Sequence, residues 1–246
     1  SSDHRNSGRI ELTGGNLTLS YVTRSFTNTG TIDIGAGRSF TAYGGTFFHE
    51  AGTTLSGPGT VSFTDVTVNL NGDFYTAPIG SVLFSNVTVN GPGTFHHAAG
   101  KTLSLTDSTL NASVVNEGLL LANRTNALNG SLATGPGSTL RLASFSGSDS
   151  NMTVASGFTN NGTIALTNTY TQSSPAAQLN VTSGTLVNAV GATIAVQYGA
   201  GFGGARILNA ELDNRGTLAV GHHLTMSRGS SDHRNSGRIE LTGGNL

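Results

Sequence analysis

The sequence predicts an all-β fold, a parallel β-helix (β-solenoid) with about 9–11 coils of roughly 19–34 residues each. Three observations predict it. The composition favours turns and strands, short glycine-centred phrases recur along the whole chain, and apolar residues alternate with small polar ones between them. Stacked coils of short parallel strands account for all three observations.

Composition excludes the two main alternatives, a disordered chain and a helical protein. The 246 residues include 35 Gly, 34 Thr and 22 Asn, and only 10% are charged. Disordered chains usually combine a high net charge with few β-branched residues, whereas this chain has a formal net charge of -1 and abundant Val, Ile and Thr. Gly, Asn and Thr are poor helix formers, and no window holds an amphipathic helical stripe.

The longest repeat divides the chain into one full unit and the start of another. The 17 residues SSDHRNSGRIELTGGNL at positions 1–17 recur without change at 230–246, so Ser1 corresponds to Ser230 and Leu17 to Leu246. So long an identity does not arise by chance. We therefore predict that residues 1–229 form one tandem repeat, folded as a continuous solenoid, and that residues 230–246 begin the next identical repeat.

Within this unit, the phrase N-x-G-T-[IL] and its relatives mark successive coils. It occurs as NSGRI, NTGTI, NEGLL, NNGTI and NRGTL, which begin at Asn6, Asn28, Asn116, Asn160 and Asn214. The glycines of these and related phrases lie 19–34 residues apart. The widest interval, from Gly59 to Gly93, has room for an extra turn. Degenerate periods of this kind are typical of solenoids.

Two local alignments predict the register between coils. GTFFHEAGTTLS (residues 45–56) matches GTFHHAAGKTLS (93–104) at a shift of 48, and FTDVTVN (63–69), FSNVTVN (84–90) and LTDSTLN (105–111) follow one another at a shift of 21. Equivalent side chains on neighbouring coils then form columns of like residues. We predict two such columns, an asparagine ladder and an internal aromatic stack, formed by Asn69, Asn90 and Asn111 and by Phe63 and Phe84.

Alternation with period two predicts which side chains face the interior. In GTIDI, Ile32 and Ile34 point inward, while Thr31 and Asp33 point outward. Glycines are expected at the corners, where they supply positive φ. We also expect residues 230–246 to continue the solenoid in register without a cap, and four residues of the duplicated segments to face the interior: Ile10, Leu12, Ile239 and Leu241.

Charge and hydropathy limit the partners. Twelve Lys+Arg against 13 Asp+Glu, with the arginines scattered, leave no basic face for nucleic acid. No apolar run reaches the roughly 18 residues of a membrane-spanning helix, so we predict no membrane insertion. The absence of cysteine removes disulfides and thiol chemistry. We predict no cofactor.

The histidines are the first candidates for a metal site. His49 and His97 are equivalent in the 48-residue alignment, which places them two coils apart on one face, and imidazole suits Zn or Ni. However, neighbouring residues of a strand point to opposite faces, so the pairs His96–His97 and His222–His223 offer one ligand per face. We therefore predict surface or corner histidines and no metal site.

Carboxylates and a glycine-rich segment are the remaining candidates for chemistry. Glu211 and Asp213 lie beside Arg206 and Arg215, but a lyase or glycosidase would need further carboxylates from neighbouring coils. We predict a structural ion pair at a strand exit and no catalytic residue. GAGFGGARI (199–207) lacks the Lys-Ser/Thr of a phosphate-binding loop and is predicted to be a corner.

The N-x-G-T-[IL] coils, with their Gly-rich corners and Thr/Ser/Asn-rich strands, resemble the large repetitive β-helical proteins of bacterial surfaces. This group includes filamentous haemagglutinin-type adhesins and autotransporter passenger domains, and the resemblance covers essentially the whole chain. It implies secretion, an extracellular or cell-surface location, right-handed coiling and a structural or adhesive role, without catalytic residues. The near-identity of the 229-residue unit departs from those adhesins, whose coils diverge in sequence.

The leading functional prediction is a structural one: a segment of an extracellular fibre or stalk, whose partner is another copy of itself, end to end or side by side. The first alternative is an adhesin that binds glycans or host proteins along its faces. Its expected signature, a cluster of exposed aromatic rings, is weak because the tyrosines are spread along the chain: Tyr21, Tyr43, Tyr75, Tyr170 and Tyr198. A β-helical polysaccharide lyase or hydrolase is the less favoured alternative, and we predict no enzymatic activity.

Overall fold

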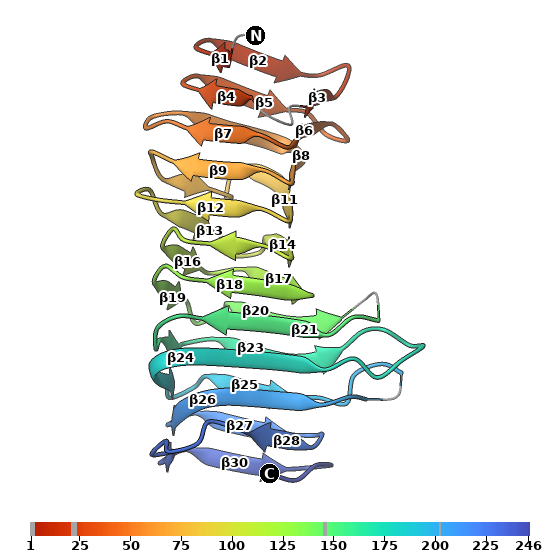
Figure 1. Cartoon of the computed structure of the whole chain (residues 1–246), viewed down its shortest axis with the longest axis vertical. Coiled ribbons are helices and arrows are strands. Elements are labelled where there is room, and N and C mark those ends of the chain that lie inside the picture. Colours follow the sequence, from red (N-terminus) through yellow and green to blue (C-terminus); the bar gives the residue numbers. More distant parts are fainter. Residues whose placement is uncertain (1–2, 21–23, 145–146, 202) are drawn as a thin grey trace.

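Parallel pairing of short strands, one coil above the next, organises the whole computed structural model (Figure 1). The structure describes residues 3–20, 24–144, 147–201 and 203–246. These residues form an elongated stack with the N-terminus at one end and the C-terminus at the other. They contain no helix, and hence none long and apolar enough to cross a bilayer. The predicted parallel β-solenoid is confirmed, with about 11 coils; its right-handed sense stays a prediction.

Three sheets run along the stack. Sheet 1 contains β1 (His4–Asn6), β4 (Ser25–Asn28), β7 (Thr46–His49), β9 (Thr67–Leu70), β12 (Thr88–Asn90), β15 (Thr109–Leu110), β18 (Thr125–Leu128), β21 (Ser150–Val154), β22 (Thr159–Asn160), β24 (Ala177–Asn188), β26 (Arg206–Asn214), β28 (Leu224–Met226) and β29 (Arg234–Asn235). Sheet 2 contains β2 (Arg9–Leu12), β3 (Leu17–Ser20), β5 (Thr31–Ile34), β6 (Ser39–Tyr43), β8 (Thr54–Thr64), β11 (Ile79–Ser85), β14 (Thr102–Thr106), β17 (Leu119–Asn123), β20 (Thr139–Ser144), β23 (Thr163–Asn168), β25 (Thr193–Val196), β27 (Thr217–Val220) and β30 (Arg238–Leu241). Sheet 3 is short and contains β10 (Phe74–Tyr75), β13 (Phe95–His97), β16 (Val114–Asn116) and β19 (Leu132–Thr134).

The dominant register is 21 residues. In sheet 1, Thr67 pairs with Thr46 and Thr88 pairs with Thr67, each 21 positions further on. The extremes are in sheet 2, where Thr102 pairs with Leu119, 17 positions on, and Thr163 pairs with Thr193, 30 positions on. The longer coils carry their extra residues in loops that project from the stack (Figure 1).

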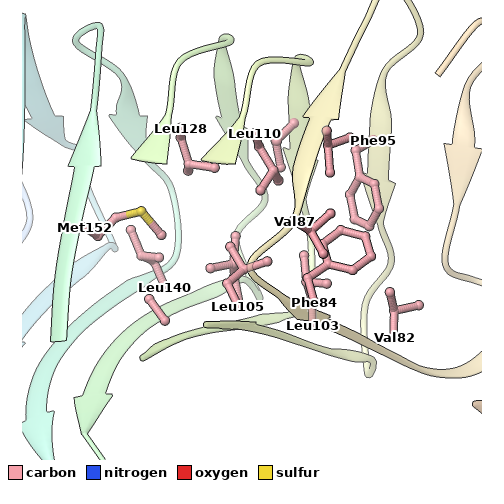
Figure 2. Packing of buried hydrophobic residues seen from close by; sticks show 14 of the residues in the cluster. Val82, Phe84, Val87, Phe95, Leu103, Leu105, Leu110, Leu128, Leu140 and Met152 are labelled. Carbon is pink, nitrogen blue, oxygen red and sulfur yellow. The ribbon is translucent and has the colours of Figure 1, made fainter. Parts of the chain in front are cut away.

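The interior is one continuous apolar cluster that extends from Leu12 to Leu224. Alternation along the strands builds it, since Ile32 and Ile34 have no exposed surface while Thr31 and Asp33 between them are partly exposed, as predicted. Figure 2 shows how side chains from different sheets meet at the centre of the stack. Aliphatic and aromatic side chains stacked on their own kind bury most of the apolar surface that stabilises the fold.

Glycine is required at the N-x-G corners for a reason other than the predicted positive φ. Neither Gly30 nor Gly216 is among the glycines with positive φ. A Cβ on Gly30 would lie 2.0 Å from the carbonyl oxygen of Gly8, and a Cβ on Gly216 would lie 2.3 Å from that of Ala189. The close approach of the preceding coil therefore excludes any side chain at these corners.

The glycines that the sequence predicts as coil markers do not all occupy equivalent positions in the coils. A Cβ on Gly93 would meet Gly72, so the wide interval from Gly59 to Gly93 does contain a further coil. Gly59 itself lies within β8 and approaches Gly35 and Arg38, while Gly80 stacks against it. The GPGT phrase of β8 thus differs in position from the N-x-G phrases, although the letters look alike.

The 48-residue alignment is correct at one corner and wrong for the preceding strand. β7 belongs to sheet 1 and pairs with β9, whereas the matching β13 belongs to sheet 3. Both strands end in a histidine that precedes a turn into sheet 2. Insertion of sheet 3 from β10 onward separates the two segments in space while it preserves the turn that follows them.

Candidate functional site: repeat junction and stacked columns

The duplicated segment forms the last coil of the structure. β29 pairs with β26, and β30 pairs with β27 from Thr217–Arg238 through Val220–Leu241. The amide Nδ2 of Asn214 donates to Oδ1 of Asn235 over 2.7 Å. Residues 230–246 therefore stack in parallel register on the coil that precedes them.

The same sequence forms the first coil, where it pairs with the strands of the following coil instead of the preceding one. β1 pairs with β4 and β2 pairs with β5, so that Ile10 lies beside Ile32. Nδ2 of Asn6 donates to Oδ1 of Asn28 over 2.8 Å. Leu12 is 9% exposed under β5, whereas its copy Leu241 is 57% exposed. The same sequence is thus found in two settings: the first copy pairs with the coil that follows it, and the second copy pairs with the coil that precedes it.

The ends of the two copies differ. Leu17 lies in β3 and pairs with Phe40, whereas Leu246 is outside any strand and is half-exposed beside a small hollow that also contacts Leu212. Ser230 occupies the left-handed region with φ 62°. Its counterpart Ser1 lies outside the described residues.

The structure brings Asn69, Asn90 and Asn111 together as an outer asparagine ladder. Asn90 donates from Nδ2 to Oδ1 of Asn69 over 3.0 Å, and Asn111 donates in the same way to Asn90 over 2.8 Å. Asn129 continues the ladder with a bond of 2.8 Å to Asn111. The ladder runs along partly exposed or exposed positions of sheet 1, where water competes for the same groups.

Phe63 and Phe84 also lie together, inside the stack, with ring centroids 5.7 Å apart. The contact belongs to a larger aromatic cluster in which Phe63 touches Phe40 and Phe47. Beyond Phe84, the rings continue to Phe95. The register of 21 residues places phenylalanines from successive coils in contact, where they contribute both burial and ring–ring attraction.

A second polar column, buried at the corner before sheet 2, was not predicted. We call it the corner column, and each of the 11 coils supplies one member: Asn6, Asn28, His49, Thr76, His97, Asn116, Thr134, Asn160, Asn188, Asn214 and Asn235. All are buried except Thr134, which is partly exposed, and Asn235 in the last coil, which is exposed. Asn188 shows the complete bonding pattern. Its Oδ1 accepts from Asn160 over 2.8 Å, and its Nδ2 donates to Oδ1 of Asn214 over 2.8 Å and to the carbonyl of Thr217 over 3.1 Å.

The signal for this column was present in the sequence. Most of its members are the asparagine of the N-x-G phrase, which by itself predicts only the number of coils. In NRGTL the bonds explain the phrase: the amide of Asn214 donates to Asn235 and to the carbonyl of Arg238 in the next coil, and Gly216 allows the preceding coil to approach. A buried amide with all its hydrogen bonds made contributes to stability and specifies the stacking register.

Two histidines replace asparagine in the middle of the corner column. His97 accepts from the hydroxyl of Thr76 at Nδ1 over 3.2 Å and donates from Nε2 to the carbonyl of Leu119 over 3.1 Å. This pattern corresponds to a neutral imidazole with its proton on Nε2. His49 lies over Phe74 with ring centroids 5.2 Å apart. The predicted corner placement is correct, but both side chains are buried rather than at the surface.

Burial lowers the pKa of both His49 and His97, although hydrogen bonds to backbone carbonyls, and for His49 the charge of Glu50, oppose the shift. We expect full stability above the unfolded-state pKa of about 6.5 and a progressive loss below it, because only the unfolded chain then binds these protons freely. Urea titrations at pH 7.5 and pH 5 measure the difference. The double variant His49→Asn/His97→Asn, which restores the residue of the other coils, should show a smaller pH dependence; an unchanged one would contradict the assignment.

No metal-binding group of three or more His, Cys, Asp or Glu is found within the described residues. His96 points away from His97 and faces Asp73, with Nε2 and Oδ2 3.6 Å apart. Nε2 of His222 donates to the carbonyl oxygen of Gly204 over 2.9 Å. The histidines therefore serve separate local contacts.

The carboxylate cluster divides into separate contacts. Arg215 and Asp213 form an ion pair of 2.6 Å at a strand exit, and Glu211 accepts from the hydroxyl of Thr185 over 2.7 Å. Arg206 is not part of it. It has no exposed surface and donates to five backbone carbonyls, which belong to Pro175, Gln197, Tyr198, Gly204 and Ala205. This buried guanidinium holds the corner at Gly204 and Ala205, within the predicted corner segment 199–207, whose Phe202 lies outside the described residues.

The architecture is that of a parallel β-solenoid of about 11 coils. No family model, curated protein or solved structure matches the chain.

Proposed function

We propose that this chain is a tandem-repeat segment of an extracellular β-solenoid fibre or stalk, which lengthens as one coil stacks on the next. A single observation carries the proposal. The identical residues 1–17 and 230–246 dock on β26 and β27 in one copy and carry β4 and β5 in the other. The unit thus contains both halves of its own junction.

Superposition of the second copy on the first defines the contacts at such a junction. A following β5 would cover Ile239 and Leu241 as the first β5 covers Ile10 and Leu12. Asn235 would donate to the next Asn28 as Asn6 does in the first copy. Both the apolar interior and the corner column would continue without a break, and no new type of contact is needed.

The charge of the chain is compatible with this assembly. A formal net charge of -1 over 246 residues opposes neither end-to-end nor lateral association. Ten coils per 229-residue unit, at the spacing of neighbouring strands, make each unit about 50 Å long. A long stalk therefore needs many units, and nearly identical units keep its cross-section constant.

The resemblance to repetitive bacterial surface proteins supports the extracellular, cell-surface location. A non-enzymatic role is supported by the ion pair of Asp213 with Arg215 and the hydrogen bond of Glu211, which engage both carboxylates in structural contacts. The partner in this proposal is another copy of the unit, without nucleic acid and without membrane insertion.

Proteins of one, two and three 229-residue units test the proposal. We expect the maximum dimension to increase by about 50 Å per unit in small-angle scattering and negative-stain images. Units that tumble independently, or that fold side by side at constant length, would overturn it.

A matched pair of variants in the two-unit protein examines the junction itself. Ile239→Asp, in the first coil of the second unit, places a charge in the apolar interior of the junction and should open it to hydrogen exchange. Thr225→Asp adds the same charge at an exposed position and should leave the junction protected. Equal protection in both variants would show that the junction does not continue the interior.

A further inference from the structure

We propose that the recess in front of Tyr75, where sheet 3 begins, binds a ring of a neutral, hexose-containing glycan. This binding role is separate from the fibre role and does not depend on it. It is carried by a cavity, by a rigidly held exposed aromatic ring and by the polar groups around that ring.

The recess exists because sheet 3 starts abruptly. β10 is its first strand, and the coil before it passes this position as a turn at residues 51–52 instead of a strand. The space left has a volume of about 360 Å³ and is lined by His49, Thr53, Thr54, Leu55, Asp73, Phe74, Tyr75, Ala77 and Pro78. This volume is within the range of small-molecule sites, which are mostly apolar with a few polar groups.

The ring of Tyr75 is exposed and yet held in place. It is 52% exposed and lies parallel to the imidazole of His96, with centroids 4.5 Å apart and an interplanar angle of 8°. Its hydroxyl donates to Oδ2 of Asp73 over 3.3 Å. Asp73 is itself held by the backbone N–H of Thr94, 2.8 Å from Oδ1. A ligand therefore meets a ring whose orientation is already set, which reduces the entropic cost of binding.

His96 covers one face of this ring, so the other face is left for the recess. His96 comes from the following coil, whereas the opposite wall, at Thr53–Leu55, comes from the preceding coil. The flat C–H face of a pyranose ring complements such an aromatic surface. The aromatic ring thus supplies apolar contact at a site that is otherwise open to water.

Polar groups at the edge of the recess suit hydroxyl ligands. The N–H groups of Phe74 and Thr76 donate toward β13. Because successive N–H groups of a strand alternate in direction, that of Tyr75 lies on the opposite edge, beside the recess. The hydroxyl of Thr54 and the carboxylate of Asp73 add a donor and acceptors. Sugar hydroxyls can pair with each of these groups.

Charge favours a neutral ligand. The lining contains no Lys or Arg that would neutralise a phosphate, sulfate or uronic acid. The single carboxylate, Asp73, already has Thr94, Tyr75 and His96 around it. A quaternary ammonium ion over Tyr75 would be the competing ligand, and it differs from a sugar in needing only the ring and the negative charge.

A smaller recess adjoins the first and extends the site along the stack. It has a volume of about 180 Å³, shares Tyr75 and Ala77 with the larger one, and includes His96, Val115 and Glu117. The two recesses lie on either side of the Tyr75–His96 pair. A glycan of two or more rings can therefore contact successive coils, whereas a monosaccharide would use the larger recess alone.

The other exposed tyrosines lack this arrangement. Tyr43 is 47% exposed on β6, and Tyr198 is 49% exposed with its ring perpendicular to that of His222. Tyr170 is partly buried, and Tyr21 lies outside the described residues. Tyr43 is therefore a suitable control, because its removal deletes an exposed ring of the same kind away from the recess.

The whole chain and three variants, Tyr75→Ala, Tyr75→Phe and Tyr43→Ala, are applied to an array of neutral, acidic and sulfated oligosaccharides. Affinities for the hits are then measured by calorimetry. We expect binding to neutral hexose oligosaccharides, an affinity loss of about tenfold or more for Tyr75→Ala, a smaller loss for Tyr75→Phe and no change for Tyr43→Ala. Far-UV circular dichroism verifies that each variant is folded.

Four outcomes would overturn the proposal: no glycan bound at millimolar concentration, binding insensitive to Tyr75→Ala, equal loss with Tyr43→Ala, or binding confined to acidic glycans. A titration with tetramethylammonium, followed by NMR, examines the competing ligand; a response at Tyr75 to the cation without any response to sugars would also overturn it. These results leave the fibre proposal untouched, since that proposal is tested by the length of multi-unit proteins and by hydrogen exchange at the junction.

Discussion

Replacement of Asn188 by alanine is expected to lower the free energy of unfolding by about 3–5 kcal/mol, since each buried polar group left unpaired costs roughly 1–3 kcal/mol. Asn188 has no exposed surface and joins three coils through its amide. The substitution leaves Oδ1 of Asn214 and the carbonyl of Thr217 without their donor. Urea titration followed by far-UV circular dichroism measures the change.

The matched control is Asn90→Ala in the outer ladder. Asn90 likewise donates to one asparagine and accepts from another, but its side chain is only half-buried, so water can replace its partners. A loss of about 1 kcal/mol or less is expected there. Equal losses at the two positions would contradict the view that burial makes the corner column the stronger of the two.

Replacement of Phe63 by alanine should cost about 3–5 kcal/mol, the usual result of removing a buried phenylalanine. Phe63 has no exposed surface and touches the rings of Phe40, Phe47 and Phe84, which come from three different coils. The cavity cannot close easily, because the backbone on every side is held by parallel pairing with the next coil.

Phe48→Ala is the control for this change. Phe48 neighbours Phe47 on β7 but points outward and is partly exposed. Its loss should cost about 1 kcal/mol, in line with surface substitutions. Thermal and urea denaturation of both variants provide the comparison, and a Phe48 variant as unstable as the Phe63 variant would show that ring identity matters more than position.

Much of the fold can be predicted from short-range patterns in the sequence. Alternation places Ile32 and Ile34 inside, and the 21-residue recurrence of FTDVTVN places Phe84 beside Phe63. A solenoid permits such inference because each coil contacts only its neighbours, so sequence period translates directly into spatial register. The outer ladder could be named residue by residue for the same reason.

The corner column could not be assigned in the same way. Asn28 and His49 are neighbours in it, yet no alignment equates an asparagine with a histidine. What they share is a corner position and a side-chain N–H that donates to a backbone carbonyl, that of Gly30 in the same coil for Asn28 and that of Asp73 in the next coil for His49. This equivalence depends on the path of the backbone, which a comparison of residue types does not reveal. Likewise, the sequence places Arg206 in a charged cluster, whereas in the structure it is buried among backbone carbonyls.

The amino-acid sequence is enough to assign the class of fold, the dominant coil period, the inward and outward faces of the strands and the duplicated segment. All of these follow from periodicity, which acts between residues close in the chain or one coil apart. Three features are visible only in the three-dimensional structure: where sheet 3 begins, which polar residues are buried at the corner, and the position of Tyr75 against His96 beside an open recess. These features depend on coils that differ in length. A change in the backbone path of one coil alters which of its side chains the next coil buries.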